Sequence, residues 1–175
     1  MDFMRRIALA ALGLVMCAAM IGFVGPASAA ETEPEMTQQQ AAEEYLDVVC
    51  ASIAATKLYN RRVYQGDPVI VWDWLRDRFP QVRRATAALS RARAHAARNL
   101  LNPPAPWPVL VEDKVRIMVN SFLRESNLYA RAAWAQRVSE WDRLDVLAGR
   151  LARKSSRVSG DIRADLGLPP PGLGC

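Results

Sequence analysis

Residues 109–135, VLVEDKVRIMVNSFLRESNLYARAAWA, decide the fold class of this 175-residue chain. Apolar residues recur in this stretch at intervals of three and four and hold one face for about six turns; they are Val111, Val115, Met118, Phe122, Tyr129 and Ala133. This spacing is typical of an amphipathic helix with one buried face. The phase slips near Trp134, and one unbroken helix from 109 to 166 would be roughly 87 Å long. We therefore predict a helix from 109 and a break at 135–139.

Three further segments show the same periodicity: residues 38–62, 81–101 and 139–166. Thr37 and Gln40 have the spacing of a capping box, which predicts the start of the first of these helices. Ser139 has the residue type and place of an N-cap for the last one. Gly167, followed by Pro169, predicts its end.

The connections complete the predicted fold. Residues 102–108, NPPAPWP, hold too many prolines for a helix and predict a stiff connection. Residues 69–79 fit either a short helix or an irregular crossover. Four long helices without strand alternation predict an all-α, up-down-up-down four-helix bundle with an extended C-terminal tail. We expect it to form one domain over 37–175.

The N-terminal residues differ in composition from the rest. Two arginines precede an uncharged apolar run at 7–24, and small residues stand at Ala27 and Ala29. This order is typical of a signal peptide over 1–29, cleaved after Ala29, and predicts a secreted or extracytoplasmic protein. The alternative is an uncleaved membrane anchor, because the apolar run just reaches spanning length. Residues 30–36, acidic and without periodicity, predict a flexible lead-in.

The cysteine count supports a disulfide. Cys17 lies in the leader, and the bulky Met16 before it is unlike the small residue of a lipobox, so we expect no lipoprotein. Cys50 and Cys175 remain, and an even count in an exported protein predicts one disulfide; two free thiols are the alternative. The extended tail is long enough to run back along the first helix as far as Cys50.

The second predicted helix is rich in arginine in a chain whose formal net charge is +5. No acidic residue lies between Asp77 and Glu112, and four arginines share one arc opposite the apolar face: Arg83, Arg84, Arg91 and Arg98. This arginine ridge is a candidate site for anionic polymers or lipid head groups. The alternative is an ordinary solvated face, partly neutralised by the acidic residues of 31–47.

Tryptophans offer a second candidate surface. Trp72 and Trp107 are expected to cap the ends of the bundle. Trp74 is then the candidate exposed aromatic, because its separation of two residues from Trp72 points it elsewhere on a helix. An exposed indole could anchor a partner protein or a membrane interface.

Signals for catalysis are weak. His95 is the single histidine and lies among arginines, while Glu43 and Asp47 form a carboxylate pair without a second acidic helix. No nucleophile, phosphate-binding or zinc-binding motif occurs in the sequence. We expect no catalytic residue, no metal and no cofactor. Nucleic acid is not an expected partner despite the pI near 9.5, because export removes the chain from it.

Four short features carry a resemblance: the leader, YLDVVC at 45–50, the WP-opened helix at 107–108 and LGLPPPGLGC at 166–175. They resemble small exported α-helical proteins of unknown function from high-GC Gram-positive bacteria, and this resemblance implies no active site. Our leading expectation is a non-enzymatic interaction module of the cell envelope or extracellular space, with an unknown protein or an anionic envelope component as partner. The alternative is anion binding through the ridge. A small-ligand carrier or an enzyme ranks last, because a carrier needs a cavity of about 300 Å³ or more.

Overall fold

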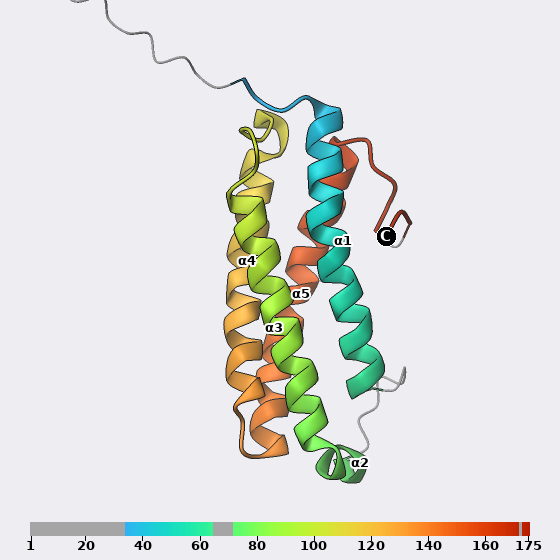
Figure 1. The fold of residues 1–175 in the computed structure, drawn as a ribbon, viewed down its shortest axis with the longest axis vertical. Coiled ribbons are helices and arrows are strands. Elements are labelled where there is room, and N and C mark those ends of the chain that lie inside the picture. The colour runs from blue at the N-terminus through green and yellow to red at the C-terminus, as the bar shows by residue number, and fades with distance from the viewer. Residues whose placement is uncertain (1–33, 65–71, 172) are drawn as a thin grey trace, which may run out of the picture. The chain divides into compact units, whose positions relative to one another are not determined.

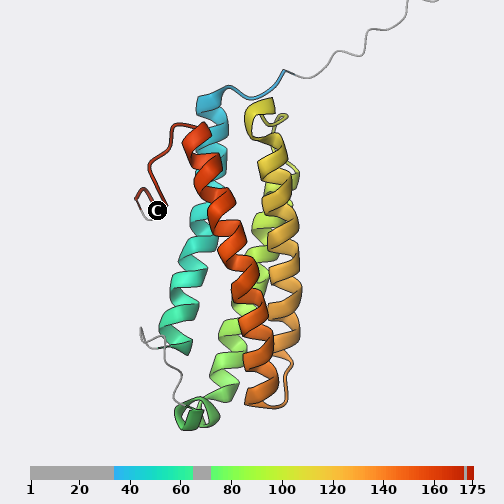
Figure 2. The ribbon, with the colours of Figure 1, turned by 180° about the vertical axis from the view of Figure 1, so that it is seen from behind.

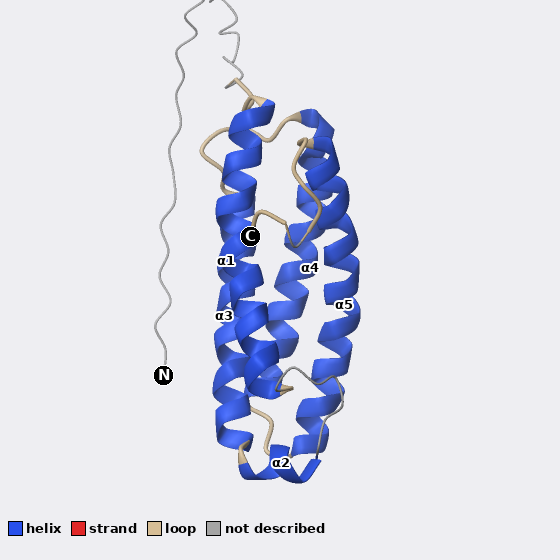
Figure 3. Ribbon diagram, turned by 90° about the vertical axis from the view of Figure 1, so that its right-hand side faces the viewer, coloured by secondary structure: helices blue, strands red, loops and turns tan. Residues whose placement is uncertain are grey.

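The computed structural model describes residues 34–64, 72–171 and 173–175, all within one compact unit, Glu33–Cys175. This part of the chain is all-helical and contains no strand (Figure 3). Its five helices are α1 (Gln38–Val63), α2 (Trp72–Asp77), α3 (Phe79–Leu101), α4 (Val109–Ala133) and α5 (Val138–Asp165). The predicted all-α class is confirmed, and the short helix predicted as one option for 69–79 is α2. The predicted signal peptide, 1–29, lies outside the described residues.

Helix ends follow local chemistry. The predicted capping box is confirmed, since Gln40 N–H donates to the Thr37 hydroxyl and Thr37 N–H donates to the Gln40 side chain at 2.9 Å. The predicted break after α4 is confirmed at Trp134, which ends that helix. The predicted N-cap at Ser139 is wrong.

Helix α5 begins one residue before that serine. Arg137 is its N-cap, in extended conformation, and makes no side-chain capping bond. The Glu140 carboxylate instead reaches back and accepts a hydrogen bond from Gln136 N–H at 3.3 Å. A first-turn carboxylate thus satisfies a backbone donor ahead of the helix, without help from a hydroxyl.

The Pro-rich connection at 102–108 packs against one end of the apolar core. Trp107 is buried as expected, and its indole N–H donates to the Leu100 carbonyl at 2.9 Å. The predicted flexible lead-in is fixed at its end, because Met36 is buried and its N–H donates to the Pro106 carbonyl at 2.9 Å. The side chain of Met36 belongs to the apolar core cluster that also contains Trp107. This burial explains why the end of the segment is ordered although its sequence predicts flexibility.

Helix α3 is central to the packing. It lies against both α1 and α4, and α4 lies against α5 (Figures 1 and 2). Ser90 and Ser126 join α3 to α4 reciprocally, each hydroxyl donating to the other residue's carbonyl at 2.9 and 3.0 Å. Small side chains at these positions allow the two backbones to approach closely.

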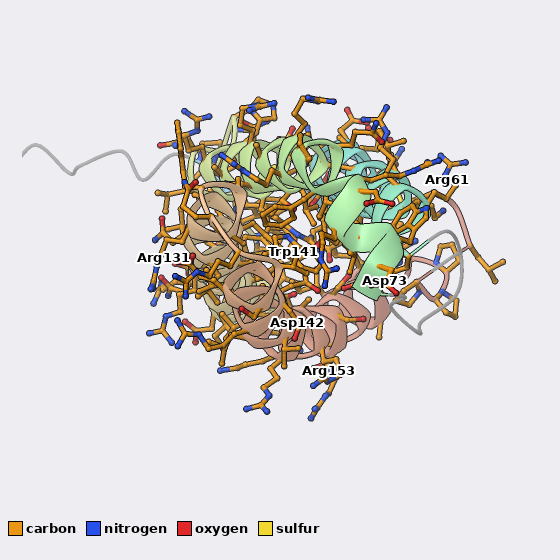
Figure 4. All side chains as sticks on the ribbon, turned by 90° about the horizontal axis from the view of Figure 1, so that it is seen from below. Arg61, Asp73, Arg131, Trp141, Asp142 and Arg153 are labelled. Atoms are coloured by element: carbon orange, nitrogen blue, oxygen red, sulfur yellow. A yellow bond between two sulfur atoms is a disulfide. The ribbon has the colours of Figure 1, made fainter. Side chains whose placement is uncertain are left out.

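Helices α1 and α5 approach less closely than the other neighbouring long helices. Side-chain hydrogen bonds bridge them at three levels: Gln38 to the Asp165 carbonyl at 2.8 Å, Tyr45 to Ser159 at 2.8 Å and Tyr59 to Asp145 at 2.6 Å. Figure 4 looks along the helices from the end where α2 crosses. Trp141 is enclosed there, while Arg61, Arg131 and Arg153 point outward.

The C-terminal tail returns along α1, and the predicted Cys50–Cys175 disulfide is confirmed with a Cα–Cα distance of 5.3 Å (Figure 1). Arg163 is fully buried beneath this tail. Its guanidinium donates to the Pro169 carbonyl at 2.6 Å and the Leu173 carbonyl at 2.8 Å. Among the described helices, none is long and apolar enough to cross a membrane.

Candidate functional site

A cleft of about 380 Å³ opens where α1 and α5 separate. Its walls come from these two helices, its base from α3 and α4, and one edge from Pro171 of the tail. Its apolar lining includes Val49 on the α1 wall and Met118 and Phe122 at the base, and all three side chains are almost fully buried. The cleft therefore joins an apolar base to a solvent-accessible mouth.

Arg93 supplies the cationic group of this cleft. The residue is only 8% exposed and lines the cleft from α3. One terminal nitrogen donates to the Ser52 hydroxyl at 2.8 Å, and the other donates to the Thr56 hydroxyl at 3.1 Å. The guanidinium also lies over the Phe122 ring, 4.6 Å from its centroid. These contacts hold the charged group in one orientation.

Glu125 lies beside Arg93 and is fully buried. Its Oε1 accepts from the Ser155 hydroxyl at 2.7 Å, and its Oε2 lies 3.0 Å from Arg93 Nε. The Nε–H is not directed at this oxygen, so neither atom makes a hydrogen bond within the described residues. Burial raises the pKa of Glu125, opposed in part by the Arg93 charge and by the Ser155 bond. Arg93 and Glu125 thus attract each other electrostatically, while Arg93 Nε–H and Glu125 Oε2 remain without a hydrogen-bond partner among the described residues.

A second buried carboxylate lies nearer the α2 end. Asp145 accepts a hydrogen bond from Tyr59 at 2.6 Å and another from Tyr64. Burial raises the pKa of Asp145, and the two phenol bonds oppose that shift. Burial also raises the pKa values of Tyr59, Tyr64 and Tyr129, so all three phenols are neutral, and Tyr59 and Tyr64 are the ones that donate to Asp145. This cluster satisfies a buried acid without a cation.

The four arginines of the predicted ridge differ in exposure. Arg84, Arg91 and Arg98 are exposed, and none forms an ion pair with another described residue. Arg83 is half-buried and donates from Nε to the Ala133 carbonyl at 2.8 Å. It therefore satisfies the C-terminal end of α4, and the exposed ridge consists of the other three.

Trp74 is half-buried, so the expectation of an exposed ring is wrong. Its ring packs against the core cluster near α2, and the Arg78 guanidinium lies 5.3 Å from the ring centroid. Trp134 is instead strongly exposed, at 76%. It lies where α4 ends, so the break in the helix turns its ring out of the core.

Sequence reasoning missed the buried charged residues. Arg93 follows Leu89 by four positions and precedes Ala96 by three, so it is in phase with the apolar stripe of α3. Glu125 likewise falls between Phe122 and Tyr129 on the stripe of α4. The sequence did contain a signal for these residues, namely a charged side chain at a position that the helical periodicity places in the core. A charged residue is buried there only when it has a partner, so each such position predicts a buried ion pair or hydrogen-bond network.

The other residues considered from the sequence, His95 and Glu43, make only local contacts among the described residues. His95 is exposed, and its Nε2 lies 3.2 Å from the Asn99 amide. Glu43 accepts a hydrogen bond from Gln39 at 3.0 Å. The described residues contain no group of three side chains placed to hold a metal ion. No family model, curated protein or solved structure matches this chain.

Proposed function

We propose that this chain is an exported, non-enzymatic helical interaction module that binds a small amphipathic molecule in the cleft between α1 and α5. The observation that carries this proposal is the cleft itself, which has an apolar base, a solvent-accessible mouth and the Arg93 guanidinium in its lining. Its volume of about 380 Å³ exceeds the minimum for a ligand pocket. The small-ligand hypothesis, ranked last from the sequence, therefore becomes the first.

The proposal includes the architecture and the compartment. We infer an up-down-up-down bundle of α1, α3, α4 and α5 that is open along the α1–α5 side. The alternating course of these helices in Figure 1 and the three hydrogen-bonded levels between α1 and α5 support this arrangement. The Cys50–Cys175 disulfide supports export, since such bonds persist in oxidising compartments.

A neutral fluorescent probe, N-phenyl-1-naphthylamine, tests occupancy of the cleft. We expect saturable binding at one site per full chain. Ser156 is exposed at the cleft, so Ser156→Trp would fill the mouth without altering the core, and should weaken binding at least about tenfold. Ser139→Trp is the matched control, because Ser139 is exposed on the same helix away from the cleft. Equal binding by both variants would contradict the proposal.

The exposed ridge of Arg84, Arg91 and Arg98 favours a second candidate function, binding of anionic envelope polymers or lipid head groups. Such binding should weaken steeply between about 50 and 200 mM salt. Vesicles containing phosphatidylglycerol provide the probe, and replacing all three arginines with Gln should abolish the interaction. Binding that persists in this triple variant would rule out the ridge.

A further inference from the structure

The charge distribution of the cleft indicates which ligands it accepts. The charged residues of its lining are Arg93 and Lys57, both cationic. Lys57 is exposed near the mouth and donates to the Cys175 carbonyl at 3.1 Å. The buried Glu125 carboxylate lies 3.0 Å from Arg93 Nε and is not part of the lining. The charged side chains that a ligand in the cleft can contact are therefore both cationic.

Arg93 is positioned to bind a planar anion. A guanidinium has five N–H donors, and each terminal nitrogen of Arg93 uses one of its two on a hydroxyl of α1. One donor on each terminal nitrogen has no acceptor among the described residues, and carboxylates are the anions that guanidinium donors bind most strongly and directionally. The hydroxyls, the Phe122 ring and the Glu125 carboxylate fix the group before any ligand arrives, which lowers the entropic cost of binding.

The rest of the cleft suits an aliphatic chain. Val49, Ile53, Met118 and Phe122 provide apolar surface beside Arg93, and the volume lies at the small end of the range for ligand pockets. We propose that the cleft binds medium-chain aliphatic carboxylates, with the carboxylate on Arg93 and the chain along the apolar base. This inference rests on the proposed function and adds the identity of the head group.

Three ligands of equal chain length separate the head group from the chain: decanoate, decanol and decyltrimethylammonium. Calorimetric titration of the full chain should give decanoate an affinity about tenfold or more above that of decanol, the usual gain from hydrogen bonds to charged groups. The cationic ligand should bind weakest. Arg93→Lys keeps the charge and removes the planar fork, and should reduce the preference for decanoate over decanol several-fold.

A second variant covers the possibility that Arg93→Lys fails to fold. Arg93→Met with Glu125→Gln removes both charges at nearly constant volume, and should bind decanoate and decanol equally. Equal affinities of the wild-type chain for these two ligands, or tightest binding of the cation, would overturn the head-group assignment and leave the proposed function standing. Failure of all three ligands and of the neutral probe would overturn both.

Discussion

At the scale of single residues, Arg93 and Glu125 form an ion pair in the interior of the unit. Glu125 is fully buried and Arg93 nearly so, and the two charges compensate each other at a distance of 3.0 Å. A buried ion pair contributes little net stability when both partners are present, because desolvation offsets the attraction. Removing one partner is different, since the other charge then remains buried alone.

This asymmetry predicts the behaviour of two variants. Arg93→Met alone should lower the free energy of unfolding by about 3–5 kcal/mol. Adding Glu125→Gln to Arg93→Met should restore at least half of that loss, because Gln is neutral and still bonds to Ser155. Urea unfolding of the single and double variants measures the difference. A double variant less stable than the single one would show that the pair is not the reason for the loss.

Asp145 predicts a pH effect with a definite sign. Its pKa is raised by burial, so between its ordinary value of 3.8 and the raised value the folded state holds a proton that the unfolded state has released. Stability from this group is therefore present at low pH and lost as pH rises through that window. Asp145→Asn removes the titration, so wild type should lose stability relative to this variant as pH rises.

Urea unfolding of both proteins at several pH values from 4 to 8 measures this difference. Glu125 titrates in the same sense and is present in both proteins, so it cancels in the comparison. Asp161→Asn is the matched control, because Asp161 is exposed and forms no ion pair with another described residue, so its replacement should leave the wild-type slope in place. A difference that is constant with pH, or that grows in favour of wild type as pH rises, would contradict the expected sign.

At the scale of helices, boundaries followed from the sequence because they depend on neighbouring residues. The predicted helix at 38–62 is α1 (Gln38–Val63), and the one at 81–101 is α3 (Phe79–Leu101). Periodicity, prolines and the capping box act within a few positions, so they are readable without a structure. The start of α5 was misplaced because a serine before an acid is a frequent cap, whereas here Glu140 reaches back to the backbone.

Thr37 and Ser139 both lie near the start of a helix, but replacing each with Ala should have different effects on stability. Thr37→Ala removes a capping box and should cost about 1 kcal/mol. Ser139→Ala removes a hydroxyl that caps nothing and should change stability by less than about 0.5 kcal/mol. Thermal unfolding of the two variants beside wild type provides the comparison, and equal losses would show that the Thr37 bonds do not stabilise the start of α1.

At the scale of the whole molecule, the disulfide and Arg163 hold the tail by different means. The bond between Cys50 and Cys175 closes a loop of 125 residues, which acts mainly by restricting the unfolded chain. Arg163 acts in the folded state, through its hydrogen bonds to two tail carbonyls. The tail should therefore stay docked when the covalent bond is absent.

Replacing both cysteines with Ala should lower the free energy of unfolding by about 2–4 kcal/mol while leaving the folded structure intact. Denaturant unfolding gives the first quantity, and limited proteolysis of residues 169–175 reports on the second. Rapid cleavage of the tail in the folded variant would show that Arg163 does not hold it. A loss of stability below about 1 kcal/mol would contradict the entropic role of the bond.

The tail and disulfide could be anticipated because chain reach and cysteine count are properties of the sequence. The cleft could not, because it depends on how far α1 stands from α5, and that separation is set by side chains contributed from four helices. Arg93 and Glu125 illustrate the difference. Their phase predicts burial, but only the packing of α3 on α4 brings the two charges together.

A crystal structure of the full chain grown with decanoate tests the central claim most directly. The account predicts one ligand between α1 and α5, with its carboxylate oxygens at hydrogen-bond distance from the Arg93 guanidinium and its chain beside Met118 and Phe122. Helices α1 and α5 closed against each other, with Arg93 out of reach of solvent and ligand, would contradict it.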